Sequence, residues 1–336
     1  MLTQFPLRRL PFLGLLCLLL SVSARAAEPA PDAAAAKAAD QLAGVHRIVF
    51  LGDSITQGGD YVTDFECWLL AHHLQTEVLN LGLASETATT LTPAENAGHL
   101  KQFGFGRPYV DERLARALAA SKPDLLCACY GMNDGSSLPA DDTGTQRFAA
   151  AITHLRDTAL QAGVKRVILC TPPVHDEKGN AKQKFHDENL TRYTAWLLSK
   201  RADGWEVVDL HTPMRQALDA QRAKNPAFEF AKDGTHPGRE GHWLMAREIL
   251  TETFGANLAG VSSADDLFPA QGTAVRKLVH ERMVLLFNAW MTSIGHQRPG
   301  VAGGPKAKPG LPLPEAKAKA AEIGKQIDQV LAGGKP

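Results

Sequence analysis

The stretch Ile48-Val49-Phe50-Leu51-Gly52-Asp53-Ser54-Ile55 joins a continuous apolar run to a short polar turn. A short apolar run bounded by glycine predicts a buried strand, and the turn after it would expose the Ser54 hydroxyl. A strand end holds such a side chain in a fixed position, which favours a nucleophile. Because a serine hydroxyl is a weak nucleophile at neutral pH, another part of the chain must supply a base.

Beyond this stretch, apolar runs alternate with helical patterns. We expect strands at Val45–Leu51, Glu77–Leu81, Asp124–Tyr130, Arg166–Thr171 and Trp205–Leu210. We expect helices at Thr63–His73, with Thr63 and Glu66 as a capping box, and at Asp111–Ser121, Gln146–Ala162, Asp187–Lys200 and Gly241–Phe254. This alternation predicts an α/β fold with a parallel sheet covered on both faces. Sites in such sheets form at the carboxyl ends of the strands.

His236 is the candidate base, and Asp233 lies three residues before it in a short polar turn. Asp233 would accept a hydrogen bond from one ring nitrogen while the other nitrogen faces the Ser54 hydroxyl. Taken alone, in a chain with twelve histidines, His236 is more typical of an ordinary residue at a helix entry. Activity that depends on this base should fall as His236 becomes protonated.

Acyl transfer also needs donors for a developing oxyanion, and losing one costs roughly 3–4 kcal/mol in a well-studied protease. Three candidates follow expected strands: the Ser54 N–H, the Gly82 N–H and the side-chain amide of Asn133. Gly82 and Asn133 are also typical turn residues, so each has a purely structural alternative.

Together, Gly52-Asp53-Ser54-Ile55, Asn80-Leu81-Gly82, Gly131-Met132-Asn133-Asp134 and Asp233-Gly234-Thr235-His236 resemble the four blocks of the SGNH (GDSL-type) hydrolases, over roughly residues 45–255. The resemblance implies a flavodoxin-like three-layer α/β/α sandwich with a five-stranded parallel sheet, and a serine esterase without a cofactor. It implies Ser54 as nucleophile, His236 as base and Asp233 as the residue that orients it. It implies an oxyanion hole of Ser54, Gly82 and Asn133. Many members carry a second glycine three residues after the block-two glycine, where this chain has Ser85.

Other polar and aromatic residues near these blocks are candidates for substrate binding. We expect Asp53 to hold its turn by accepting local N–H bonds. Asp134 would bind substrate or brace Asn133. The long connection from Ser85 to Tyr109 would line a substrate rim or pack on its own aromatic residues, and it carries Phe103, Phe105, Arg107 and Tyr109.

Composition narrows the function classes. Lys and Arg total 36, as do Asp and Glu, so there is no electrostatic case for binding nucleic acid or an anionic membrane. Three of the cysteines Cys67, Cys127, Cys129 and Cys170 lie in expected strands, so we expect free buried thiols, with a disulfide as the alternative. Without a Cys-x-x-Cys or a paired-histidine spacing, no metal site is expected.

The chain is expected to have four parts. Residues 1–26 resemble a signal peptide, with Arg8 and Arg9 before an apolar stretch and an Ala24-Arg25-Ala26 cleavage pattern. Residues 27–44 are an Ala/Pro-rich linker, 45–258 the hydrolase domain, and 259–336 a helical extension with helices at Thr273–Ile294 and Pro314–Leu331 and no expected chemistry. The expected location is periplasmic or extracellular, without a stable membrane anchor.

These observations favour an exported serine esterase that forms an acyl-enzyme on Ser54. A small acyl group on a small-molecule or glycan ester, such as an O-acetyl group on carbohydrate, is the expected substrate. A lipolytic or lysophospholipase-type acylhydrolase would use the same residues and remains the alternative. A catalytically silent carbohydrate-binding module is the alternative from another class. The oligomeric state stays open.

Overall fold

A five-stranded sheet in the order β2-β1-β3-β4-β5 forms the centre of the computed structural model, which describes residue 1, residues 33–176 and residues 184–333. The strands are β1 (Arg47–Gly52), β2 (Glu77–Asn80), β3 (Leu125–Cys129), β4 (Arg166–Cys170) and β5 (Glu206–Val208). Every pairing is parallel. This order is that of the flavodoxin-like doubly wound fold, in which sites form where the strand order reverses, between β1 and β3.

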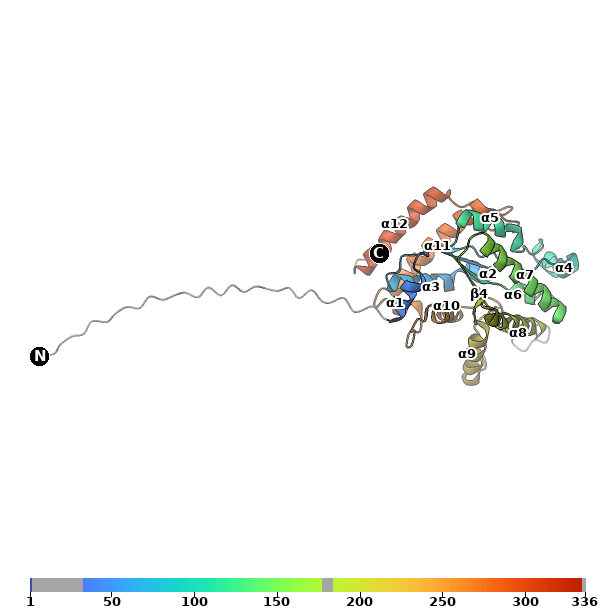
Figure 1. The fold of residues 1–336 in the computed structure, drawn as a ribbon, viewed down its shortest axis with the longest axis horizontal. Coiled ribbons are helices and arrows are strands. Elements are labelled where there is room, and N and C mark those ends of the chain that lie inside the picture. The colour runs from blue at the N-terminus through green and yellow to red at the C-terminus, as the bar shows by residue number, and fades with distance from the viewer. Residues whose placement is uncertain (2–32, 177–183, 334–336) are drawn as a thin grey trace. The chain divides into compact units, whose positions relative to one another are not determined.

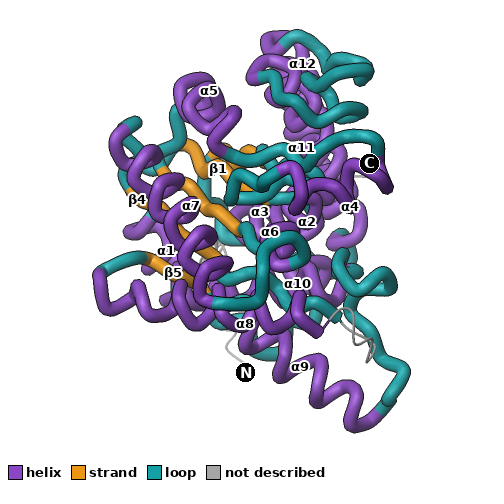
Figure 2. The backbone as a smooth tube through the Cα atoms, turned by 90° about the vertical axis from the view of Figure 1, so that its right-hand side faces the viewer, coloured by secondary structure: helices purple, strands orange, loops and turns teal. Residues whose placement is uncertain are grey.

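Helices cover both faces of the sheet (Figures 1 and 2). On one face, α3 (Asp60–Ala71) packs against α10 (Arg239–Phe254), while α5 (Asp111–Ser121), α7 (Asp142–Gln161) and α8 (Lys184–Ser199) pack in succession on the other. Because β3 is buried along its whole length, its sequence is continuously apolar rather than alternating. The expected α/β/α sandwich is confirmed.

Shorter elements surround these layers. They are α1 (Ala33–Gln41), α2 (Ser54–Gly58), α4 (Pro93–Phe103), α6 (Met132–Gly135), α9 (His211–Lys224), and the 3₁₀ helices η1 (Lys200–Asp203) and η2 (Ala264–Leu267). The start of α2 directly after β1, and of α6 shortly after β3, puts two sequence blocks at one end of the sheet.

The C-terminal segment is packed onto this core. Helix α11 (Gly272–Ile294) contacts α3, α5 and β2, and α12 (Leu313–Leu331) packs on α11 (Figure 1). Arg276 of α11 bonds Asp60 and Asp64 of α3, each at 2.6 Å, and Arg282 bonds Glu66 at 2.9 Å. These partly buried ion pairs join the expected extension to the first layer of helices.

Several local expectations need correction. Thr63 does not cap α3, because that helix begins at Asp60 after Gly59, whose φ is 81°; Thr63 instead contacts His280 of α11. The connection after Ser85 contains α4, whose own capping box is formed by Thr92 and Glu95. Part of the expected linker is α1, in which Ala38 is fully buried.

Cys67, Cys127, Cys129 and Cys170 are buried free thiols, as expected. The expected signal peptide and residues 27–32 lie outside the described residues. Within the described ranges, no helix combines the length and apolar character needed to cross a bilayer. The same ranges contain no cluster of three or more His, Cys, Asp or Glu residues suited to a metal ion.

Candidate active site

Ser54 is the first residue of α2 and lies where β1 ends, between β2 and β3 in the sheet. Asp53 caps this helix, because its buried carboxylate accepts the Ile55 N–H at 2.9 Å. The expected structural role of Asp53 is confirmed. Burial raises the pKa of Asp53 to about 7, while the Ile55 N–H and His236 act in the opposite direction. The same turn leaves the Ser54 N–H without an intrahelical acceptor, as at any helix start.

Ser54, His236 and Asp233 form a hydrogen-bonded chain across 182 residues of sequence. The Ser54 hydroxyl lies 2.7 Å from His236 Nε2, and His236 Nδ1 lies 2.6 Å from Asp233 Oδ2. Since an ionised carboxylate only accepts, Nδ1 carries the proton and Nε2 is free to take one from the serine. This is the arrangement that an activated serine requires.

Asp233 is held in place by its own turn. Its Oδ1 accepts the N–H groups of Thr235 at 2.9 Å and His236 at 2.8 Å, and Gly234 between them has a φ of 83°. Partial burial raises the pKa of Asp233, but the hydrogen bonds from the His236 ring and from these two N–H groups outweigh it and lower the value to about 2. The carboxylate is therefore ionised at neutral pH.

Asn133 lies in α6, at the end of β3 and one strand away from Ser54. Its Oδ1 accepts from Arg107 Nη1 at 2.6 Å, and its Nδ2 donates to the Glu86 carbonyl at 2.9 Å. One Nδ2 hydrogen remains for an oxyanion. Asn133 and Ser54 line the same cavity, as the expected oxyanion hole requires.

Gly82, the third expected donor, is placed differently. Its N–H donates to Asn80 Oδ1 at 2.9 Å, and the residue is buried outside the cavity wall. A Cβ here would lie 2.3 Å from Gln57 N, so the glycine lets this loop pass close beneath α2. Gly82 is thus a packing residue in this structure, and the expected role in the oxyanion hole is wrong.

Ser85, three residues after Gly82, lies in the cavity wall, where the third oxyanion donor was expected. It lines the cavity, has a φ of 69° and, among the described residues, its N–H has no acceptor. A non-glycine residue in the left-handed region is strained, and such strain concentrates at functional sites. The sequence signal was the glycine that many family members carry here.

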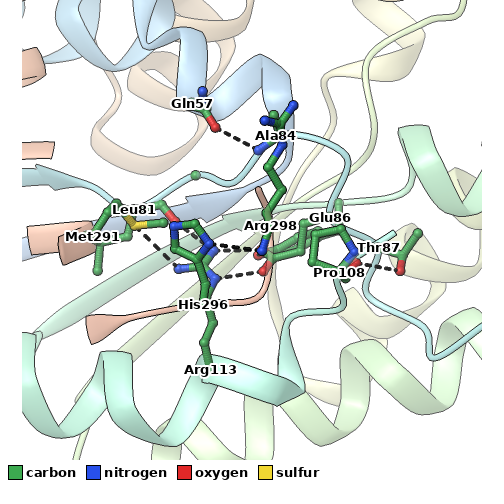
Figure 3. Close-up of polar contacts among 12 residues, drawn as sticks. Gln57, Leu81, Ala84, Glu86, Thr87, Pro108, Arg113, Met291, His296 and Arg298 are labelled. Carbon is green, nitrogen blue, oxygen red and sulfur yellow. Dashed lines mark hydrogen bonds and ion pairs between the residues drawn. The ribbon is translucent and has the colours of Figure 1, made fainter. Parts of the chain in front are cut away.

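The loop that presents Ser85 is held from both sides (Figure 3). Gln57 Oε1 accepts the Ala84 N–H at 2.8 Å, and the Thr87 N–H donates to the Pro108 carbonyl at 3.0 Å. Beneath it, the fully buried Arg113 pairs with Glu86 at 2.6 Å and donates to the Leu81 carbonyl at 2.8 Å. A buried, fully bonded ion pair fixes the loop in one arrangement.

Three of the residues expected to bind substrate do not line the cavity. Asp134 is fully buried and accepts the N–H groups of Ala88 and Thr89, so it braces the loop after Ser85. Tyr109 forms a bridge with Thr87. Phe105 packs under His99, with ring centroids 4.9 Å apart.

The cavity has a volume of about 530 Å³, and most of its described lining residues carry polar side chains. Polar side chains that sequence reasoning did not assign to the site include His99, His175, His186 and Arg298, whereas Arg107 was expected at a substrate rim. The exposed rings of Phe103 and Phe185 lie at its edge, with 54% and 41% of their surface accessible. Arg107 and Phe103 lie in the connection that predicted a substrate rim, whereas nothing in the sequence pattern singled out the others.

A family of known proteins matches the part of the chain that carries the site. Residues 50–244 match the sequence model of a family described as GDSL-like Lipase/Acylhydrolase. The sequence matches none of the curated proteins compared with it.

Two solved structures show a limited similarity to this chain. One is a gut microbial diltiazem-metabolizing enzyme, with 22% identity, a TM-score of 0.46, and coverage of 62% of this chain and 46% of that chain. The chain thus spans about half the length of that enzyme. The other is a catalytic mutant of Axe2, an acetylxylan esterase from Geobacillus stearothermophilus, with 20% identity, a TM-score of 0.46, and coverage of 63% of this chain and 95% of that chain.

Proposed function

Because the chain belongs to the GDSL-like lipase/acylhydrolase family and is a serine ester hydrolase, we propose that it is an exported esterase that removes small acyl groups from carbohydrate. The observation that carries the proposal is the bonded chain of Asp233, His236 and Ser54, which opens into a cavity lined mostly by residues with polar side chains. Export rests on the N-terminal sequence alone.

In the proposed reaction, Ser54 Oγ attacks the ester carbonyl carbon while His236 Nε2 takes the hydroxyl proton. The tetrahedral oxyanion is held by the N–H groups of Ser54 and Ser85 and by Asn133 Nδ2. As the intermediate collapses, the imidazolium returns the proton to the departing alcohol oxygen, which leaves an acyl group on Ser54. Water then attacks the acyl-enzyme with the same base, releasing the acid and the free serine.

Two features of the cavity support a small acyl group and a polar alcohol. Among the described lining residues, the apolar side chains are Ala84, Met132, Phe103 and Phe185, and the two phenylalanines are exposed at the edge. This set is too small to enclose a long acyl chain. Histidine and arginine side chains offer hydrogen bonds to hydroxyl groups, and exposed aromatic rings mark a binding surface.

The acyl preference is tested with p-nitrophenyl acetate, butyrate and octanoate. We expect the highest kcat/KM on acetate, and release of acetate from acetylated glycans that is lost in Ser54→Ala. The intact mass of the protein after rapid quenching should show one added acyl group, carried on Ser54. A preference for octanoate would instead support the lipolytic alternative, since Phe103 and Phe185 would then contact the chain.

Reaction with a fluorophosphonate separates an enzyme from a silent binding module. The wild type should be labelled at Ser54, and His236→Ala should label much more slowly because the base is missing. An unlabelled wild type would indicate a binding module. Export is tested separately: the mature protein outside the cytoplasm should begin near residue 27.

A further inference from the structure

The C-terminal segment contributes a side chain to the active-site cavity. Arg298, four residues after the end of α11, lies in the cavity wall with Ala84, Ser85 and Arg107. The family match ends at residue 244, so this arginine comes from outside the matched region. The cavity is therefore completed by a part of the chain for which the sequence predicted no chemistry.

Arg298 is held by a bonded loop. The backbone N–H of Arg298 donates to His296 Nδ1 at 3.2 Å (Figure 3), and His296 Nε2 donates to the Ala302 carbonyl at 2.9 Å. Since a backbone N–H can only donate, His296 is neutral with its proton on Nε2. Arg116 of α5 holds the start of the loop by donating to the Ile294 carbonyl at 3.2 Å.

The Arg298 guanidinium lies over the Phe105 ring, with Cζ 5.1 Å from its centroid. Phe105, which the sequence predicted to bind substrate, thus supports the side chain that faces the cavity. Across the described residues, no carboxylate forms an ion pair with Arg298; Nη1 donates to the Pro299 carbonyl at 2.5 Å. A guanidinium stacked on an aromatic face keeps its edge N–H groups free for a planar anion.

Arg107 lines the same cavity, and the His99 ring and the Arg298 guanidinium both contact the Phe105 ring. Burial lowers the pKa of His99, and the charges of Arg107 and Arg298 lower it further. Burial lowers the pKa of Arg107, while Asp134 and Asp53 act in the opposite direction. Asp233, the one carboxylate among the described lining residues, is bonded to His236. Arg298 therefore remains the least compensated charge in the cavity.

We propose that Arg298, with Arg107 beside it, forms an anion-binding subsite, so that the ester substrate carries a carboxylate near its acyl group, as in an acylated acidic sugar. This inference rests on the proposed function, because it concerns the alcohol part of the same ester. Arg–carboxylate recognition is frequently bidentate, which would fix the orientation of the sugar as well as bind it.

Binding of the non-reactive sugars glucuronate and glucose to the full-length protein, measured by calorimetry, tests the subsite without requiring activity. Glucuronate should bind at least tenfold more tightly than glucose, and more weakly as salt increases. Arg298→Gln should remove most of this preference, and Arg298→Lys should keep part of it. Lys308→Gln, an exposed change of the same charge in the same segment, should leave it unchanged.

Equal binding of the two sugars by the wild type, or an equal loss of preference in Lys308→Gln, would overturn the subsite. Kinetics provide the second arm, with methyl glucoside acetate and methyl glucuronoside acetate as substrates. Arg298→Gln should lower kcat/KM about tenfold on the acidic ester and little on the neutral one. If neither ester is hydrolysed while glucuronate still binds through Arg298, the proposed function fails and the subsite stands.

Discussion

Arg107 Nη1 donates to Asn133 Oδ1 over 2.6 Å, and this bond fixes which edge of the Asn133 amide faces the reacting group. A guanidinium can only donate, so the amide oxygen must face Arg107 and the amide nitrogen must face the opposite way. The Glu86 carbonyl, which can only accept, holds that nitrogen from below. Two partners of fixed polarity therefore orient a side chain that could otherwise flip.

Asn133→Ala should lower kcat by about 10²–10³, because one oxyanion donor is lost, with little change in KM. Arg107→Lys should lower kcat less, since it acts through the orientation of Asn133. In the Asn133→Ala background the Arg107→Lys change should have little further effect on kcat. Additive losses in this double-mutant cycle would show that Arg107 acts independently of Asn133.

Gly82 and Ser85 provide a test of which backbone N–H binds the oxyanion. Gly82→Ala should destabilise the protein by about 1–3 kcal/mol, because its Cβ would meet the backbone of α2. Ser85→Gly should keep kcat and stability, since the N–H remains and the left-handed backbone is relaxed. Unfolding in urea and steady-state kinetics measure both. A Gly82→Ala protein of normal stability but low kcat would return the oxyanion role to Gly82.

Asp233→Asn should lower kcat strongly, by about 10⁴ if the effect matches that seen in a well-studied serine protease. The pKa of Asp233 is depressed to about 2, so its stabilising effect is present above its unfolded value near 3.9 and lost only as pH falls toward 2. Steady-state kinetics of the wild type and the variant measure the loss of kcat. An Asp233→Asn enzyme with the wild-type kcat would show that Asp233 does not orient the base.

Asp53→Asn should change how stability depends on pH. Burial raises the pKa of Asp53 from an unfolded value near 3.9 to about 7, so its contribution favours folding below pH 4 and is lost as pH rises through 7. The shift of about three units limits this loss to about 4 kcal/mol. An asparagine can still cap α2, so the variant should gain stability relative to wild type between pH 5 and 8. Urea midpoints that keep a constant difference across this range would contradict the assignment.

Arg276→Ala should cost about 3–5 kcal/mol, because it leaves Asp64 buried without its partner. Lys277→Ala is the matched control, because Lys277 follows Arg276 in the same helix. The Lys277 side chain is 75% exposed and lies 3.8 Å from Glu281, so the free energy of unfolding should change by no more than about 0.5 kcal/mol. Equal effects of the two substitutions in urea denaturation would show that α11 is not anchored to α3 through Arg276.

The strands and most helices followed from local sequence, because two-sided burial requires continuous apolar runs and helix faces require a regular period. The expected ranges at Arg166 and Asp111 agree closely with β4 and α5. Helix α4 was not predicted, because the aromatic residues around it suggested a binding loop. Thr92 and Glu95 nevertheless form a capping box that marks its start. The start of α3 was misplaced because a glycine with positive φ, rather than a threonine, precedes it.

The sequence by itself determined the fold class, the nucleophile, its base and the orienting carboxylate, because each belongs to a short block whose local chemistry is specific. Only the tertiary structure decided which backbone N–H faces the cavity, because the Asn80 side chain occupies the Gly82 N–H and leaves that of Ser85 free. Only the tertiary structure places Arg298 in the same cavity, because α11 packs on α3 and α5. Contacts between segments more than 200 residues apart depend on how whole faces pack, and no local pattern encodes them.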